Sequence, residues 1–283
     1  MRHMNNTGIA IAFDYLEEIN YALVQSKMDI CNWCIIENNS EADMENIQLD
    51  ISNEYVDTYL SMPFRLEAKQ KIRVQDIKLR VNADKLLSLT EKVSSNIRLR
   101  IVSGEEVLKE HLFPITFMAY NQWHGIECYP QLLASFITPN HPCIARIVKR
   151  ASDHLLRKYG TNDLNGYYTG SKEDVRRQIK AIYQSLQDEK LSYVLNVPSY
   201  EEKGQRIRLA SEVTNDKLGN CLDLTLLFAA CLEYVGINTL LIIEWEHIYL
   251  GAWLTPDSHI RSADDDLTFL LKKTSEGIEE IIV

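Results

Sequence analysis

The sequence has no long run of apolar residues. Hydrophobic side chains make up 46% of its 283 residues, yet no apolar stretch approaches the about 20 residues that span a bilayer. A secretory signal is also lacking, because residues 1–8 are polar and the apolar run at residues 9–13 is too short. We therefore expect a cytoplasmic protein without a membrane segment.

Basic side chains are outnumbered by acidic ones. The chain carries 30 Lys and Arg against 40 Asp and Glu, which gives a formal net charge of −10 at pH 7. General affinity for nucleic acid rests on the neutralisation of phosphates by Lys and Arg, and the sequence offers no basic stretch interleaved with aromatic residues. This composition disfavours nucleic-acid binding as a function of the chain taken alone.

Cysteine is sparse and irregularly spaced, which argues against a disulfide framework. The six cysteines are Cys31, Cys34, Cys128, Cys143, Cys221 and Cys231. The first two have the spacing of a metal or redox motif, but residues three apart on a strand point to opposite faces, and a zinc site needs a second ligand pair that the sequence lacks. We predict reduced thiols, with Cys31 and Cys34 as core or edge residues, and neither a metal nor another cofactor.

The length of the chain favours two domains. Six segments in its first part show the apolar alternation of strands, with turns at residues 38–40 and 103–105. These segments are residues 9–13, 28–36, 47–51, 71–79, 97–102 and 107–118. Apolar residues between positions 15 and 23 have the spacing of a short helix. We predict an immunoglobulin-like β-sandwich over residues 1–122.

An aromatic stretch around Trp123 marks the expected boundary, and residues 123–283 are predicted to form an α+β domain. One helix begins at Pro142, where apolar residues follow at helical spacing, and a second begins after Ser171. His141 and His154 lie beside or in the first of these helices. Neither has an evident Cys or carboxylate partner at metal spacing, so we interpret both as surface or structural residues.

The most informative stretch runs from residue 218 to residue 254. A Gly-Asn turn places Cys221 in the first turn of an apolar helix that ends near Gly236. Two β-rich runs follow, and His247 begins the second of them. A thiol at a helix N-terminus lies among unpaired N–H groups at the positive end of the helix dipole, which favours the thiolate. With a histidine on an adjacent strand as base, this is the Cys-His pattern of nucleophilic catalysis.

This order of features resembles the transglutaminase-like branch of the papain-like cysteine enzymes. The resemblance rests on Gly-Asn-Cys before an alanine-rich helix, on the closing Gly236, and on a strand from His247 to Trp253. A narrower resemblance is to a module at the amino end of large bacterial superfamily 1 helicase proteins, some of them linked to anti-phage defence. Its matching residues are 139–142, 198–201, 204–206, 218–228 and 251–254. The resemblance implies a transglutaminase-like domain after an immunoglobulin-like one.

The resemblance also implies roles for individual residues. In such enzymes a polar side chain ahead of the nucleophile holds the oxyanion together with the cysteine's own N–H, and Gln205 matches that position and chemistry. The alternatives are a buried structural thiol for Cys221, a solvated loop residue for Gln205 and a surface strand residue for His247. Glu246 stands where relatives tend to have glycine, which changes access to the pocket.

The third member of the site is an acid that orients the histidine. The resemblance places it just past a strand at residues 279–283, where the sequence stops, so we expect a domain shortened at its carboxyl end. The three acids at residues 264–266, Asp264, Asp265 and Asp266, are available substitutes, although such a run is more typical of a solvated turn or helix cap. Asp223 is predicted to cap its helix, and Cys231 to lie in the core.

Two functions remain open. In the first, the chain is a cysteine hydrolase or acyltransferase that acts on protein amide bonds, by proteolysis or deamidation more readily than by cross-linking. Cys221 is then the nucleophile, His247 the base and Gln205 the oxyanion donor. In the second, the chain is a catalytically silent recognition or scaffold module of a helicase protein. In either case the partner is a protein or peptide, and nucleic acid is reached only through the helicase region.

Overall fold

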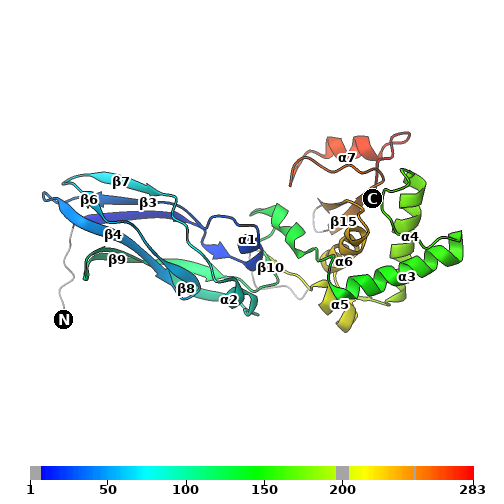
Figure 1. Ribbon diagram of the computed structural model, residues 1–283, viewed down its shortest axis with the longest axis horizontal. Coiled ribbons are helices and arrows are strands. Elements are labelled where there is room, and N and C mark those ends of the chain that lie inside the picture. The colour runs from blue at the N-terminus through cyan, green and yellow to red at the C-terminus, as the bar shows by residue number, and fades with distance from the viewer. Residues whose placement is uncertain (1–7, 196–203, 245–246) are drawn as a thin grey trace. The chain divides into compact units, whose positions relative to one another are not determined.

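The computed structural model describes residues 8–195, 204–244 and 247–283. The chain divides into two compact units, Met1–Gln122 and Trp123–Val283. Strands dominate the first unit, whereas the second combines helices with short strands (Figure 1). The predicted α+β class is therefore confirmed.

Two sheets make up the first unit. One has the strand order β1-β3-β7 and consists of β1 (Ile9–Tyr15), β3 (Cys31–Asn38) and β7 (Lys71–Gln75). The other has the order β2-β9-β8-β4-β5, with β6 paired to β4. Its strands are β2 (Glu18–Ile19), β4 (Met44–Asn53), β5 (Val56–Leu60), β6 (Phe64–Leu66), β8 (Val93–Ser103) and β9 (Glu106–Phe117). The short helices are α1 (Tyr21–Gln25) and α2 (Ala83–Leu87).

One core is shared by the two sheets. Alternate residues of β4 and β8 point into it beside residues of β3. These fully or almost fully buried side chains are Ile36, Ile47, Leu49, Ile51, Ile97, Leu99 and Ile101. The strands predicted at residues 47–51 and 97–102 are thereby confirmed, because the alternation that indicated them is the one that fills this core.

The helix predicted around residues 15–23 begins later than expected. Glu18 and Ile19 instead form β2, which pairs in parallel with β9. The helix starts after Asn20, whose side chain accepts a hydrogen bond from the Leu23 N–H at 2.8 Å. Pairing with β9 satisfies the backbone of residues 18–19, and the cap then sets the helix start.

Cys31 and Cys34 lie in the same core, so the prediction that they occupy opposite faces is wrong. The register between β1 and β3 shifts after Asp14, which leaves Asn32 as an extra residue and resets the alternation. Both cysteines are buried, and burial raises the pKa of each thiol to about 12. Their interpretation as core residues is confirmed.

Alkaline pH should destabilise the first unit through these two thiols. Because their pKa values are raised in the folded state, the protonated thiols contribute stability that is complete below the ordinary pKa of 9.0 and is lost as the pH rises toward about 12. In this window the free energy of unfolding, measured by denaturant titration, should fall more steeply for the wild type than for a Cys31→Ala/Cys34→Ala variant. Cys128→Ala removes an exposed thiol and should keep the wild-type slope. Parallel curves for the wild type and the double variant would contradict this account.

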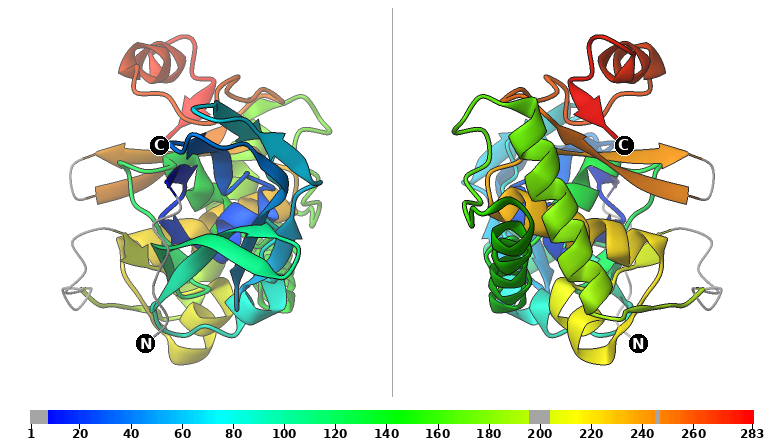
Figure 2. Two further views of the ribbon diagram at one scale, coloured as in Figure 1. Left: turned by 90° about the vertical axis from the view of Figure 1, so that its left-hand side faces the viewer. Right: turned by 90° about the vertical axis from the view of Figure 1, so that its right-hand side faces the viewer.

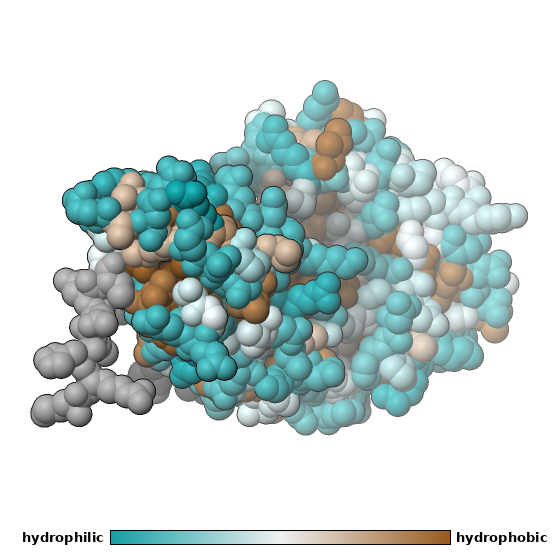
Figure 3. Space-filling view, turned by 60° about the vertical axis from the view of Figure 1, so that its left-hand side comes forward, coloured by the Kyte–Doolittle hydropathy of each residue, from teal (hydrophilic) through white to brown (hydrophobic). Residues whose placement is uncertain are grey.

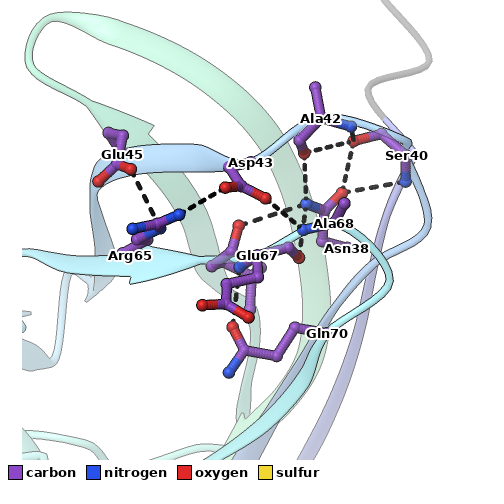
Figure 4. Close-up of polar contacts among 10 residues, drawn as sticks. Asn38, Ser40, Ala42, Asp43, Glu45, Arg65, Glu67, Ala68 and Gln70 are labelled. Atoms are coloured by element: carbon purple, nitrogen blue, oxygen red, sulfur yellow. Dashed lines mark hydrogen bonds and ion pairs between the residues drawn. The ribbon is translucent and has the colours of Figure 1, made fainter.

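A buried amide closes the turn after β3 (Figure 4). The Asn38 side chain is fully buried, and its Nδ2 donates to the carbonyl groups of Ala42 at 2.9 Å and Glu67 at 3.0 Å. Its Oδ1 accepts from the N–H and the hydroxyl of Ser40. The predicted turn at residues 38–40 is therefore tied to the chain that follows β6.

In the part that the structure describes, the longer α-helices of the second unit are α3 (Pro142–Tyr159), α4 (Lys172–Asp188), α6 (Cys221–Tyr234) and α7 (Leu267–Thr274). It also contains the shorter α5 (Ala210–Asp216) and the 3-10 helix η1 (Pro130–Phe136). Its short strands are β11 (Ser192–Tyr193), β12 (Gln205–Arg206), β13 (Leu218–Gly219) and β16 (Ile281–Ile282), and β10 (Gln122–Trp123) stands at its start. The β14 (Thr239–Glu244) and β15 (His247–Trp253) strands form an antiparallel hairpin, and the sheet order is β14-β15-β16 (Figure 2).

Helices α3, α4 and α6 surround a core that also takes one face of β15. Its buried residues include Ile144 and Ile147 of α3, Ile182 of α4, Leu227 of α6 and Ala252 of β15. The predicted helix starts are confirmed: Pro142 is the first residue of α3, and the Ser171 hydroxyl caps α4 by accepting from the Asp174 N–H. No pattern in the sequence predicted α5, whose Glu212 side chain accepts from the Leu209 N–H at 2.8 Å.

The surface is mixed in character. On the face drawn in Figure 3, hydrophobic side chains are interspersed among hydrophilic ones. Within the described ranges, no helix has both the length and the apolar character to cross a membrane.

Candidate thiol site

Cys221 is the first residue of α6, as predicted. Asn220 is the N-cap, and its side chain accepts from the Asp223 N–H at 2.9 Å while the Asp223 carboxylate accepts from the Asn220 N–H at 3.1 Å. This reciprocal capping box fixes where the helix begins. Cys221 is partly exposed, whereas Cys231 of the same helix is fully buried and burial raises its pKa. The core assignment of Cys231 is confirmed.

Asp223 also holds the preceding segment of the chain. Its side chain is fully buried and accepts from the Arg208 N–H at 2.8 Å and from the Arg208 guanidinium at 3.1 Å. The predicted capping role of Asp223 is confirmed, and the Arg208 charge is engaged in this pair. The carboxylate therefore binds the helix start and the segment just before α5, and it does not face an open pocket.

Gln205 lies on this tethered segment. It belongs to β12, is partly buried, and precedes Arg208 by three residues. Its carboxamide has no hydrogen-bond partner among the residues that the structure describes. The amide can therefore donate to a ligand. Residues 198–201, which contribute to the resemblance, lie outside the described ranges.

His247 comes to the same end of the helix as Cys221. The Thr225 hydroxyl, one turn after Cys221, is 3.4 Å from the carbonyl oxygen of Ile248, the residue that follows His247. Further along, Phe228 and Leu232 of α6 border the same groove as Leu250 and Ala252 of β15. The helix and the strand thus run side by side, so Cys221 lies toward the beginning of β15.

The two side chains do not meet in this structure. Successive residues of β15 alternate between its faces, and Leu250 and Ala252 pack into the core with α6. His247 is on the other face, where it is exposed and its ring lies 6.4 Å from that of Tyr249. No hydrogen bond joins the Cys221 thiol to His247 in the described part of the chain. Proton transfer between them requires the imidazole to come over to the helix side of the hairpin. Glu246, the departure from the family pattern, lies outside the described residues.

The acids considered for the third role are engaged elsewhere. The pairing of β16 with β15 involves only Ala252 and Trp253, at the far end of the strand from His247. Asp266 caps α7 by accepting from the Thr268 N–H at 2.9 Å. Asp264 lies 3.4 Å from a different histidine, His259. Neither of these two acids orients His247, and Asp265 is exposed.

Two histidines have acidic partners that the sequence did not indicate. The Nε2 of His259 lies 3.4 Å from the Asp264 carboxylate, and the centroid of its ring lies 4.3 Å from that of Phe269. His154 lacked an evident carboxylate partner in the sequence, yet its Nε2 is 2.7 Å from Asp188 at the end of α4. Such pairs depend on helix packing, so only the spacing of His259 and Asp264 in one loop could have indicated a contact.

His141 is the N-cap of α3, and its Nδ1 lies 3.0 Å from the Cys143 sulfur. Cys143 is buried. Over the described residues, no group of three or more His, Cys, Asp or Glu side chains has the arrangement of a metal site.

Comparisons with known proteins add little. No protein-family model matches the chain, and no curated protein matches it significantly. A solved structure that matches, the crystal structure of a FixG-related protein from Vibrio parahaemolyticus, has 15% sequence identity and a TM-score of 0.27, and the match covers 40% of this chain and 94% of that one. A likeness this weak indicates neither a shared fold nor a shared function.

Proposed function

We propose that residues 123–283 form a transglutaminase-like cysteine hydrolase or acyltransferase core that acts on protein amide bonds, preceded by an immunoglobulin-like sandwich in residues 1–122. One observation carries the proposal. A partly exposed cysteine begins α6, and the strand that packs along this helix begins with a histidine at the same end. The resemblance to helicase-linked modules extends the proposal to a place beside a helicase in a larger protein of anti-phage defence.

The proposed chemistry uses the residues named from the sequence. The Cys221 sulfur attacks the amide carbonyl carbon, and the carbonyl electron pair moves to the oxygen, where the Cys221 N–H and the Gln205 amide donate to it. His247 takes the thiol proton and passes it to the leaving amine as the C–N bond breaks. Water then hydrolyses the thioester. Proteolysis or deamidation is favoured over cross-linking, since nothing in the sequence marks a site for a second amine.

A second candidate is a catalytically silent recognition module of the same fold. The position of His247 on the face of β15 away from α6, without a hydrogen bond to Cys221, favours it. In this case Cys221 is an ordinary thiol, and the module acts by binding a protein.

The alkylation rate of Cys221 distinguishes the two candidates. Iodoacetamide labelling, read at each cysteine by mass spectrometry, compares Cys221 with the exposed Cys128 in the same molecules. The enzyme proposal predicts that Cys221 reacts near neutral pH at least about tenfold faster than Cys128, although it is the less exposed of the two. A Cys221 that reacts no faster than Cys128 would leave the recognition module as the better account. The buried Cys31, Cys34 and Cys231 should stay unlabelled and report that the fold is intact.

A further inference from the structure

β14 is an edge strand of the β14-β15-β16 sheet. It pairs with β15 over six consecutive residues, from Thr239 opposite Ala252 to Glu244 opposite His247, without a bulge. The Trp253 N–H donates to the Asn238 carbonyl at 3.0 Å, which marks these two residues as a hydrogen-bonded pair. Hydrogen-bonded and non-hydrogen-bonded pairs alternate in an antiparallel ladder. The N–H and C=O groups of Thr239, Leu241 and Ile243 therefore point away from β15.

These outward backbone groups are unpaired in the part of the chain that the structure describes. Within β14, the alternation leaves Leu240, Ile242 and Glu244 bonded to β15. The first five residues of the strand are half-buried. Amide groups on such an edge are a template for another strand. The geometry fits a main chain in extended conformation.

The edge of β14 also lacks the features that protect other strands. The edge strand β7 carries Lys71 and Arg73 at alternating positions, and the pairing of β5 is interrupted by a register shift. Residues 239–243 contain neither a charged residue nor proline. Charges, proline and bulges are the usual means of keeping edges from pairing. Without them, the edge of β14 is open to pairing with another strand.

We propose that β14 binds an extended segment of a partner protein as an added β-strand. Alternating aliphatic residues would suit the segment, because Leu241 and Ile243 flank the edge on one face of the sheet and Leu240 and Ile242 on the other. Basic residues would suit its ends, because Glu244 is exposed at one end of β14 and Glu233 bonds to the Thr239 hydroxyl at the other.

A second copy of the chain is a poor occupant of this edge. Antiparallel pairing of two β14 strands sets Ile243 of one copy opposite Thr239 of the other. Glu244 of each copy then lies near the other copy's Glu233, and each chain carries a net charge of −10. Like charges so placed oppose association. A basic, aliphatic peptide avoids this repulsion.

Binding at β14 does not depend on a reactive thiol. An added strand would end near the hairpin tip, at the end of α6 where Cys221 lies, so the same edge would also present a substrate if the thiol is active. Peptide binding can be measured without turnover, so a failure of binding is distinguishable from a failure of the proposed activity.

The test is fluorescence anisotropy with a short labelled peptide of alternating valine and threonine that has lysine at each end. Ile243→Pro removes one outward donor at an edge position where proline is tolerated, and Ile243→Val is the matched control that keeps the N–H. We expect binding by the wild type and by Ile243→Val, and about tenfold weaker binding by Ile243→Pro. Glu244→Lys should also weaken binding, in a manner that added salt reduces.

A second measurement uses the unaltered protein, so that a loss of binding does not reflect misfolding of the proline variant. The same peptide N-methylated at each valine and threonine cannot pair as a strand, and it should lose binding to the unaltered protein. Equal affinity for the methylated and unmethylated peptides overturns the proposal, as does the absence of binding at about millimolar peptide. Sedimentation that shows a dimer of the wild type and a monomer of Ile243→Pro also overturns it, in favour of a second copy.

Discussion

Replacing Gly166 by alanine should lower the free energy of unfolding of the second unit by about 4 kcal/mol. Gly166 has a φ of +58°, in the left-handed region that favours glycine. A Cβ atom there would stand 2.7 Å from the Val235 carbonyl oxygen and 3.2 Å from that of Gly236. Both atoms belong to the backbone at the end of α6, so the loop before α4 would have to move.

The surroundings of Gly166 make such a movement unfavourable. The Gln178 side chain is buried and accepts from the Gly166 N–H at 2.9 Å, while its Nε2 donates to the Gly166 carbonyl at 2.9 Å. A shift of the loop would break this pair and leave a buried amide of α4 unsatisfied. Gly166 is thus the point at which the α3–α4 loop packs closely against the turn between α6 and β14.

Gly170→Ala is the matched control. Gly170 also has a positive φ, +67°, but a Cβ atom there would meet nothing within 4 Å. This variant should lose only the conformational term, about 1 kcal/mol. Chemical denaturation of the two variants separates strain from steric overlap. Similar losses in both would show that the approach to the end of α6 is not as close as described.

Replacing Asp223 by alanine should lower the free energy of unfolding by about 3 kcal/mol. The variant loses the hydrogen bonds that the buried carboxylate accepts from Asn220 and Arg208, and the Arg208 guanidinium loses its partner. The start of α6 would then lose both its cap and its link to the segment that carries Gln205. Thermal and denaturant unfolding measure the loss.

Asp216→Ala serves as the control for Asp223→Ala. Asp216 is exposed at the carboxyl end of α5, where an acid opposes the helix dipole, so its removal should be neutral or slightly stabilising. An Asp223→Ala variant that kept full stability while Cys221 lost its reactivity would contradict the structural role of Asp223 and indicate a direct part in the chemistry.

Sequence patterns predicted the helices and strands that carry a strong periodicity or a cap. Ser171 and Pro142 mark helix starts by local chemistry, and the alternation of Ile47, Leu49 and Ile51 reflects one buried face. Cys221 was located in the same way, by the turn before it. In each case the information is contained in a few neighbouring residues.

Features that depend on pairing or packing could not be predicted in this way. The extra residue Asn32 changes the face of Cys31 only because β1 pairs with β3 in a shifted register. The partner of His154 comes from another helix. The face of β15 on which His247 lies depends on which alternate residues of the strand pack on α6, and these are Leu250 and Ala252. The Cys-His pattern therefore predicted that the two residues lie at one end of α6. It did not predict on which face of β15 the imidazole lies.

The effect of His247 on the reactivity of Cys221 is the most direct test of the proposed pair. The alkylation rate of Cys221 near neutral pH should fall about tenfold in His247→Ala and become similar to that of Cys128. Tyr249→Ala, which changes an exposed side chain on the same face of β15, should leave the rate unchanged. An alkylation rate of Cys221 that is the same in wild type, His247→Ala and Tyr249→Ala would contradict the pair, and with it the assignment of this core as a cysteine hydrolase.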